Sequence, residues 1–372
     1  MKLVLDVSAA AKPRRTGIGH YVARLAEALL VADPTLAVTL GIRLGRWRRR
    51  AHAWTPDARF ADRVTMRWFP SSWPSLGLPD ADVAHGPDER IVGGKAPQVV
   101  TIHDLFSLKS DAWSDAEFRA MKLARHAATV ARAARIVVPS AATARDVETL
   151  LRVPAERISV TPLGVDASFH RVPEEVARPV LARLGVRPPF VLFVGLAQPR
   201  KNLESIVTVF ARLAARIDDL SLVLAGSDGY PEGRLTALIK ETGAVERVKV
   251  LGYTDADDLP ALYSAASLLL FPSRDEGFGM PVLEAMACGC PAIVSDRGAL
   301  PEVVGPGGFV FGADAFDDLE DGCRRLLEDE DARRAEIERG LLRAAEFPWS
   351  RTATATLAAY RAAIDARNAP AT

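Results

Sequence analysis

The chain has 372 residues, of which 49% are hydrophobic and 25% are charged, and its formal net charge is zero. This length is more typical of two domains than of one, and the composition is that of a globular protein. Because the opposite charges balance, no global field favours binding to nucleic acid.

The three cysteines are Cys288, Cys290 and Cys323, and they form no C-x-x-C pair. An odd number without that spacing predicts a reducing compartment and small buried side chains, with neither disulfides nor a metal site. No apolar stretch reaches the roughly 18 residues that span a membrane, so we expect no transmembrane helix. Residues 1–8 alternate as in a strand and lack the long apolar region of a signal peptide, which predicts a cytoplasmic protein.

Strands and helices alternate along the chain, which predicts parallel sheets covered by helices. In the first half we expect strands at 3–7, 38–42, 82–85, 98–102, 135–139 and 158–162, and helices at 19–30, 114–134 and 141–151. In the second half we expect strands at 190–194, 221–225, 248–251, 268–271 and 292–295, and a helix at 203–216. The proline-rich stretch 163–189 between them predicts a linker with a short helix.

One Gly-rich segment of the first half precedes a predicted helix. Residues 16–20, TGIGH, lack the third glycine of a dinucleotide fingerprint, and Gly17 lies ten residues past Val7, too far for that tight turn. We expect a flexible loop in which Gly17 or Gly19 approaches a bound ligand. A plain helix start is the alternative.

Polar residues end the predicted strand at 98–102, where the sequence reads Thr-Ile-His103-Asp104. In a doubly wound domain, residues at the carboxyl end of a strand face the ligand. We therefore expect His103 to contact a substrate and Asp104 to orient it or to touch an acceptor. A structural histidine is the alternative.

Residues 41–70 carry eight arginines, opposed by Asp57 and Asp62. Basic residues interleaved with aromatic ones are typical of segments that bind an anionic membrane surface. A solvated basic face with some core tryptophans is the alternative, and nucleic acid is disfavoured because no known binding module accompanies the segment. The interleaved aromatic residues are Trp47, Trp54, Trp68 and Trp73.

Residues 195–202, GLAQPRKN, follow a predicted strand and open a helix. Arg200 and Lys201 are adjacent cations at a helix start, where they oppose the helix dipole, and this favours a bound anion. Fixed cations can stabilise the negative charge that develops on a leaving phosphate group without a metal. No Asp-x-Asp occurs where a phosphate is expected, so we expect neither a metal nor another cofactor.

Residues 273–289, SRDEGFGMPVLEAMACG, follow a predicted buried strand and open another helix. Glycines in the turn let backbone amides approach a ligand, and the helix start attracts anions. Pro281 stands where a first helical residue is expected, since its missing N–H costs nothing there. Glu276 and Glu284 flank the turn with seven residues between them. Carboxylates bind hydroxyls and amides bind phosphate, so the segment suits a sugar–phosphate–ribose ligand.

The segment EGFGMPVLE resembles the Glu-x7-Glu motif of retaining GT-B glycosyltransferases, specifically glycosyltransferase family 4. Residues 160–169 resemble the interdomain landmark of the family, 195–202 its phosphate loop and 250–253 its nucleotide-side strand and turn. Many relatives carry an arginine directly after the strand glycine, where this chain has Leu196. We expect Arg200 to compensate.

The resemblance implies an α/β fold of the GT-B type, with two doubly wound Rossmann-like domains facing a cleft. It implies an acceptor-side domain at 1–170 and a nucleotide-sugar-binding domain at 171–350. A C-terminal helix at 351–372 would cross back to the first domain, and Trp349 and Tyr360 suit it.

The resemblance also implies transfer of a sugar from a nucleotide donor with retention at the anomeric carbon. Glu284 would accept hydrogen bonds from the ribose, and Glu276 would hold the sugar. The leaving phosphate would help to deprotonate the acceptor on a front-face path, and a covalent role for Glu276 stays open. The implied catalytic residues are His103, Glu276, Lys201 and Arg200. The implied donor-binding residues are Gly17, Gly19, Gly277, Phe278, Gly279, Met280, Pro281, Val282, Glu284, Gly226, Tyr253 and Ser273. The implied acceptor-side residues are Asp104 and His20.

The Pro-Arg-Lys-Asn form of the loop is common among mannosyltransferase-like members, so the first donor expected is GDP-mannose, followed by UDP-glucose or UDP-N-acetylglucosamine. The acceptor would be a saccharide or lipid-linked glycan of the cell surface, reached by a cytoplasmic protein that binds the inner face of the membrane. A phosphorylase is disfavoured because nothing marks a pyridoxal-phosphate lysine. A non-catalytic nucleotide-sugar-binding subunit is the other alternative, and it would be expected to have lost Glu276, Lys201 or His103.

Overall fold

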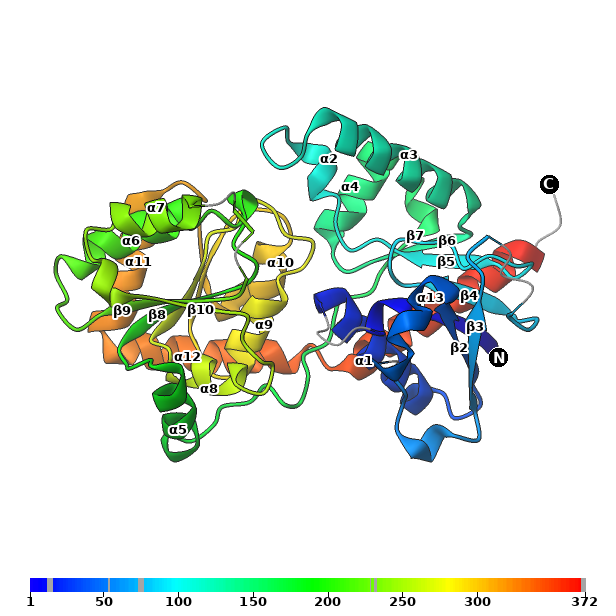
Figure 1. Ribbon diagram of the computed structural model, residues 1–372, viewed down its shortest axis with the longest axis horizontal. Coiled ribbons are helices and arrows are strands. Elements are labelled where there is room, and N and C mark those ends of the chain that lie inside the picture. The colour runs from blue at the N-terminus through cyan, green and yellow to red at the C-terminus, as the bar shows by residue number, and fades with distance from the viewer. Residues whose placement is uncertain (12–15, 53, 73–76, 228, 231–232, 369–372) are drawn as a thin grey trace. The chain divides into compact units, whose positions relative to one another are not determined.

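The computed structural model describes residues 1–11, 16–52, 54–72, 77–227, 229–230 and 233–368, and for 49–52 it describes only the backbone. The chain forms two compact units. The first comprises Met1–Gly164 and Pro348–Thr372, and the second comprises Val165–Phe347. The blue, cyan and red parts of the ribbon belong to the first unit, and the green to orange parts belong to the second (Figure 1). The two predicted divisions, after residues 170 and 350, differ from these bounds by a few residues.

The first unit is built on a parallel sheet whose described strands have the order β3-β2-β1-β4-β5-β6-β7. Its central strands are apolar and buried on both faces, as parallel strands covered by helices are. The strands are β1 (Lys2–Asp6), β2 (Ala37–Arg43), β3 (Val64–Phe69), β4 (Val83–Gly86), β5 (Gln98–Thr101), β6 (Arg135–Val138) and β7 (Ile158–Val160).

Helices cover both faces of this sheet. On one face, Val130 and Val147 of two helices pack on Val100 and Ile136 of the strands. On the other face the C-terminal helix packs against the first helix and against β4 to β7, as Figure 1 shows in red and blue. The helices are α1 (Gly17–Ala32), α2 (Phe106–Lys109), α3 (Ala116–Arg132), α4 (Ala141–Leu151) and α13 (Trp349–Asn368).

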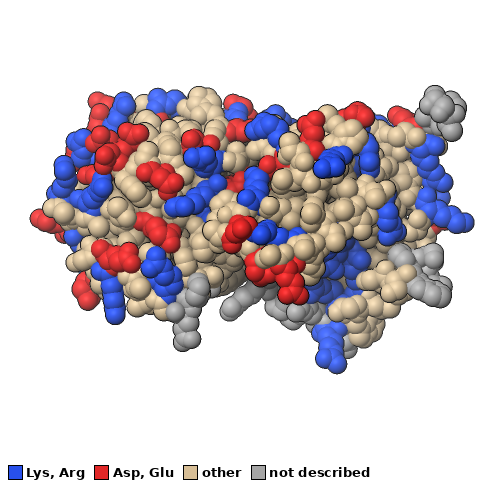
Figure 2. Space-filling model, turned by 90° about the horizontal axis from the view of Figure 1, so that it is seen from above, with Lys and Arg blue, Asp and Glu red and all other residues tan. Residues whose placement is uncertain are grey.

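The second unit has a parallel sheet with the described order β10-β9-β8-β11-β12-β13. The strands are β8 (Phe190–Val194), β9 (Ser221–Ala225), β10 (Val248–Gly252), β11 (Leu268–Phe271), β12 (Ala292–Ser295) and β13 (Phe309–Phe311). The helices are α5 (Glu174–Leu184), α6 (Leu203–Ala214), α7 (Arg234–Glu241), α8 (Leu259–Ala265), α9 (Met280–Ala287), α10 (Leu300–Val304), α11 (Phe316–Glu328) and α12 (Glu330–Ala345). Helices α6 and α11 pack together, and α9 packs with α8 and α12. Acidic and basic side chains are interspersed over the face of this unit in Figure 2.

One prediction for the first unit is wrong, and one strand was not predicted. Gly17 and Gly19 do not form a flexible loop, because α1 begins at Gly17 with Thr16 as its N-cap. The segment 41–70 contains a whole strand, β3, at the edge of the sheet. Its exposed and half-buried side chains alternate, so it has no apolar run like those of the central strands.

In each sheet the chain winds outward in opposite directions from a central pair of strands. These switch points lie between β1 and β4 in the first unit and between β8 and β11 in the second. Ligands of doubly wound proteins bind beyond the carboxyl ends of the strands at such points. In the part of the chain that the structure describes, no helix is long and apolar enough to cross a membrane.

Candidate active site

The loops after β8 and β11 are tied together at the switch point of the second unit. The Asn202 side-chain amide is buried and donates to the carbonyl oxygens of Pro272, at 3.1 Å, and Ala313, at 2.9 Å. The backbone N–H of Arg274 donates to the carbonyl oxygen of Arg200 at 2.8 Å. Asn202 has φ of +57°, which an asparagine adopts more readily than most residues. The two loops therefore form one rigid frame, although some 70 residues separate them.

Within this frame Glu276 accepts from two cations. Lys201 Nζ donates to Glu276 Oε1, and Arg200 Nη1 lies 3.1 Å from the same oxygen. Arg200 also donates to the carbonyl oxygen of Asp275 at 2.8 Å. Lys201 Nζ lies 4.7 Å from the centre of the Phe271 ring. All three charged side chains are largely buried, which strengthens their interaction over that of an exposed pair.

The charge state of Glu276 follows from this environment. Burial acts to raise the pKa of its carboxyl, but Lys201 and Arg200 together outweigh burial and hold the pKa below its ordinary value. The neighbouring Ser273 hydroxyl acts in the same direction. The cluster thus keeps one carboxylate and two cations ionised at neutral pH, with a net positive charge. It can bind an anion and hydroxyl groups at once.

Backbone groups are accessible beside this cluster. Gly195 and Gly226 follow β8 and β9 with φ of +150° and +139°. A Cβ atom on Gly226 would lie 1.9 Å from the carbonyl oxygen of Gly195, so no side chain fits there. Tyr253 follows β10 and is 43% exposed. The predicted donor-binding residues Gly226 and Tyr253 thus lie at the carboxyl ends of neighbouring strands.

The turn before α9 has the predicted form with one change. Gly279, with φ of +104°, is the N-cap, and the helix begins at Met280, so Pro281 is the second helical residue and not the first. Phe278 and Val282 are buried, and their packing fixes the turn against the sheet. The amino end of α9 and its dipole point at this turn, which suits a bound anion.

Glu284 lies one turn into α9, where Tyr263 of α8 donates to its Oε2 at 3.0 Å. Burial raises the pKa of the Glu284 carboxyl to about 7, and the negative charge of Asp166 adds to that effect. Tyr263 was not predicted as a site residue, because a tyrosine in a short apolar helix gives no sign of its partner. The structure brings Glu276, Lys201 and Arg200 into contact with one another. Glu284 instead contacts Tyr263.

His103 follows β5 in the first unit and is fixed on two sides. Its Nε2 lies 2.9 Å from the carbonyl oxygen of Pro87, and its ring packs edge-on against Tyr21, with 4.8 Å between ring centres. Burial lowers the pKa of His103, so the imidazole is neutral at pH 7. Because a carbonyl only accepts, Nε2 carries the proton and Nδ1 is the acceptor atom.

A chain of buried polar groups supports this histidine. The Tyr21 hydroxyl lies 3.1 Å from Thr101 Oγ1, which lies 2.8 Å from His85 Nε2. His85 Nδ1 in turn lies 2.7 Å from the Tyr360 hydroxyl of α13. Burial lowers the pKa of His85 to about 3, so this chain is uncharged. His85 was not predicted as part of this site, since only its place at the end of β4 hinted at such a role.

The other predicted residues of the first unit surround the start of α1 and the end of β5. Gly17 and His20 are exposed in the first turn of α1, and Gly19 is buried. A Cβ atom on Gly17 would meet no atom within 4 Å. Asp104 is half-buried directly after His103.

Comparison with known proteins shows which family the chain belongs to. Residues 15–169 match the model of Glycosyltransferase Family 4, and residues 182–343 match that of Glycosyl transferases group 1. The chain is 30% identical to O-antigen chain mannosyltransferase B of Escherichia coli over 283 residues, which cover 75% of this chain and 74% of the relative. The chain belongs to glycosyltransferase family 4.

A second relative and a solved structure agree with this family. D-inositol 3-phosphate glycosyltransferase of Nocardia farcinica is 33% identical over 282 residues, covering 73% of this chain but only 62% of that relative. The structure of Anabaena HepE in complex with UDP and glucose matches with a TM-score of 0.73 and 20% identity, covering 96% of this chain and 98% of that one. This family 4 chain therefore has the GT-B fold and is a glycosyltransferase.

The arginine-rich segment 41–70 of this glycosyltransferase is only partly exposed. Arg43 is buried, and its Nε lies 2.7 Å from Asp6 Oδ2. Arg63 donates to the carbonyl oxygens of Leu30, in the last turn of α1, and of Asp33, which follows that helix. Trp54 is 8% exposed, whereas Trp47 is 49% exposed. Trp73 lies outside the described residues. Arg43 and Trp54 thus lie in the interior of the first unit, and Trp54 fits the alternative of core tryptophans. Membrane binding by the segment stays a prediction.

A cavity of about 1320 Å³ lies elsewhere in the second unit. It is lined by α5 and by the residues at the amino ends of β8, β9 and β10. These ends are opposite to the switch-point loops of the same sheet. The doubly wound rule and the ionised cluster both favour the carboxyl ends as the reactive site.

Proposed function

We propose that this glycosyltransferase moves mannose from GDP-mannose to a saccharide or lipid-linked acceptor of a cell-surface glycan, with retention at the anomeric carbon. The observation that carries the proposal is the cluster of Lys201, Arg200 and Glu276 at the β8–β11 switch point. The mannose donor is supported by the relative from Escherichia coli, which is a mannosyltransferase.

The second unit holds the nucleotide sugar in this proposal. Its diphosphate contacts Lys201 and Arg200, and the amides of Gly277 to Gly279 help to hold the sugar. The sugar hydroxyls donate to Glu276, and the ribose hydroxyls donate to Glu284. When the sugar–phosphate bond breaks, negative charge grows on the β-phosphate, and the two fixed cations stabilise it without reorganisation.

The acceptor is held by the first unit, where His103, Asp104 and His20 are the proposed contacts. His103 is neutral, so its Nδ1 accepts a hydrogen bond from a sugar hydroxyl and brings no positive charge. The leaving phosphate takes the proton of the acceptor hydroxyl on the same face as the departing group. This path gives retention without a covalent intermediate on Glu276.

We further propose that the reaction needs neither a divalent metal nor another cofactor. Two cations already lie where the diphosphate charge would grow. Activity measured in excess EDTA should match that in buffer within about twofold. A complete loss that Mg²⁺ or Mn²⁺ restores would contradict the proposal.

A panel of nucleotides tests the donor. We expect GDP and GDP-mannose to raise the melting temperature of the protein more than UDP, ADP or their sugars, because a ligand that binds the folded state stabilises it. Transfer from GDP-mannose should then give an α-mannosyl product by NMR. A larger shift with UDP and UDP-glucose would favour the second candidate, a UDP-sugar donor, which the HepE complex with UDP and glucose supports.

A further inference from the structure

The switch point of the first unit carries a carboxyl group that the donor chemistry above does not use. Asp88 lies in the turn directly after β4, and Asp6 ends the neighbouring strand β1. The Asp88 side chain is 17% exposed, so a ligand can reach it. Its Oδ1 is buried and has no hydrogen-bond partner among the described residues. The nearest cation contact is Arg90 Nε, 3.9 Å from Oδ2, which is too long for a hydrogen bond.

The turn that presents Asp88 is held tightly. A Cβ atom on Gly86 would lie 1.6 Å from the carbonyl oxygen of Arg90, so the turn folds closely over the end of the strand. On one side His103 donates from Nε2 to the carbonyl oxygen of Pro87 at 2.9 Å. This contact joins the turn directly to the residue proposed to meet the sugar.

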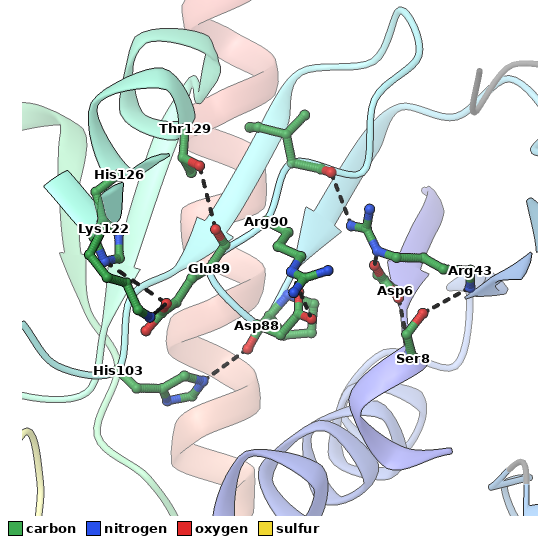
Figure 3. Close-up of polar contacts among 12 residues, drawn as sticks. Asp6, Ser8, Arg43, Asp88, Glu89, Arg90, His103, Lys122, His126 and Thr129 are labelled. Atoms are coloured by element: carbon green, nitrogen blue, oxygen red, sulfur yellow. Dashed lines mark hydrogen bonds and ion pairs between the residues drawn. The ribbon is translucent and has the colours of Figure 1, made fainter. Parts of the chain in front are cut away.

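On the other side Glu89 is held by α3. Glu89 has φ of +66°, a conformation that costs energy for a residue other than glycine. Its carboxylate lies 3.4 Å from Lys122 Nζ and 3.9 Å from His126 Nε2, and its backbone carbonyl lies 3.4 Å from Thr129 Oγ1 (Figure 3). Its backbone N–H donates to Thr101 at 3.1 Å. Four contacts thus maintain a strained residue next to Asp88, and strain that is so maintained is typical of ligand sites.

A buried ion pair at the end of β1 lies near Asp88. Arg43 of β2 pairs with Asp6 at 2.7 Å and donates to the carbonyl oxygen of Ile91 at 3.1 Å. Its backbone N–H donates to Ser8 Oγ at 2.9 Å. Because Asp6 pairs with Arg43 at 2.7 Å, the ion pair described for Asp88 is the longer contact with Arg90 at 3.9 Å. A buried carboxylate oxygen without a hydrogen bond, as Asp88 Oδ1 is among the described residues, is costly and requires an explanation.

We infer that the Asp88 carboxylate accepts a hydrogen bond from a hydroxyl group of the saccharide acceptor and so positions that acceptor in the first unit. The inference rests on the proposed function, because it presumes that the first unit binds a saccharide. The recognised group is a neutral sugar hydroxyl, since the carboxylate accepts and repels anions. Asp88 is a positioning residue for the acceptor and takes no part in donor binding.

The protonation of Asp88 gives the inference a second observable. Burial raises the pKa of the Asp88 carboxyl to about 7, and Asp6 of β1 adds to this, while Arg43 of β2, Arg90 of the turn and Arg125 of α3 oppose it. Only the ionised form accepts at both oxygens. The kcat/KM for the acceptor, measured with saturating donor, should therefore rise with pH through about 7 and then level off.

The experiment compares Asp88→Asn with Asp80→Asn, a matched control at an exposed residue of the same unit. Methyl α-glycosides of mannose, glucose and galactose serve as acceptors, and the one that the wild type uses best is chosen. We expect Asp88→Asn to lower kcat/KM for that acceptor roughly tenfold or more, as for loss of a hydrogen bond to a charged group. It should also lose the pH limb near 7, and it should melt no lower than the control.

The remaining outcomes separate the inference from the proposed function. Affinity for GDP, measured by calorimetry, should be the same in Asp88→Asn, the control and the wild type. If Asp88→Asn transfers to the glycoside as well as the control does, with the same pH profile, the inference is wrong and the proposed function stands. If the wild type binds neither GDP nor UDP, or glycosylates none of the glycosides, the proposed function fails, and the inference fails with it.

Discussion

The two switch points of this glycosyltransferase have the same topology and opposite chemistry. At the β8–β11 point, Lys201 and Arg200 share one carboxylate, so the site has a net positive charge. At the β1–β4 point, Arg43 is paired with Asp6, Asp88 has only the long 3.9 Å contact with Arg90 among its described ion pairs, and His103 is neutral. The same doubly wound frame thus carries a net positive cluster at one switch point and a carboxyl group beside a neutral histidine at the other, which suits the proposed donor diphosphate and the proposed acceptor hydroxyl.

The two sites also differ in how they are held. The loops after β8 and β11 are joined by the amide of Asn202, which also donates to the carbonyl oxygen of Ala313 after β13. The turn after β4 is held by Glu89 in a strained conformation and by His103. Substitutions at the first site should therefore alter charge stabilisation in the transition state, and substitutions at the second should alter acceptor use.

The largest effect is expected for Lys201→Ala. This change removes one of the two cations that would meet the growing charge on the leaving phosphate, so kcat should fall about 30- to 900-fold, which corresponds to 2–4 kcal/mol. Steady-state kinetics with saturating donor measures it, and Lys240→Ala on the exposed face of α7 is the control. Because the change also breaks a buried ion pair, circular dichroism must show a folded protein at the assay temperature. Turnover within threefold of the control would remove Lys201 from the mechanism.

Glu276→Gln should depress turnover next most strongly. The substitution keeps the shape of the side chain but loses the charge that binds Lys201 and the sugar hydroxyls, so kcat with saturating donor should fall roughly 10- to 100-fold. Affinity for free GDP should change little, because the diphosphate contacts the cations. Calorimetry with the sugar-free nucleotide separates these effects. A variant that loses GDP affinity and keeps its turnover would reverse the assigned orientation of the donor.

Glu284→Gln should weaken nucleotide binding roughly tenfold and leave kcat with saturating donor nearly intact, since one charged acceptor of ribose hydroxyls is lost. The exposed Glu338→Gln of α12 is the control. The wild type should bind GDP tightly above pH 7 and progressively less tightly as the pH falls through about 7, where the carboxyl is protonated. Glu284→Gln should lack this pH dependence. Equal pH profiles in the two proteins would show that the ribose does not meet Glu284.

The raised pKa of Glu284 also makes the stability of the folded protein depend on pH. A raised pKa means that the folded state binds its proton more tightly than the unfolded state does, so this group's contribution to stability is lost as the pH rises toward about 7. Glu284→Gln should therefore raise the melting temperature at pH 8 relative to the wild type more than it does at pH 4. This check needs no substrate.

The sequence predicted the apolar strands and the two reactive turns of the second unit, because buried parallel strands read as continuous apolar runs and the turns hold Gly, Pro and charged residues together. It missed β3, whose alternating half-buried residues resemble a surface segment. It also missed Asp88 and Tyr263, because their roles depend on contacts made in three dimensions. The contact of Lys201 with Glu276 joins residues 75 positions apart, and only the family resemblance related them.

The smallest expected effect is on membrane binding by the edge of the first unit, where β3 lies. There Trp47 is 49% exposed and packs edge-on against Trp68 of β3, with 5.0 Å between ring centres. Arg48 and Arg67 are exposed near it, whereas Arg43 is occupied by Asp6. We propose that this edge binds anionic membranes, as Trp and Arg residues at a lipid surface do.

Vesicle sedimentation at low salt tests this proposal. Binding should rise with anionic lipid content and fall with salt, because the Debye length shortens. Each cation removed at the surface should weaken binding roughly fivefold, so Arg48→Ala with Arg67→Ala should have a clear effect. Arg132→Ala on α3, exposed in the same unit, removes a charge away from the edge and should change little. If the control weakens binding as much per charge as Arg48→Ala does, the attraction comes from the charge of the whole unit, and the edge has no special role.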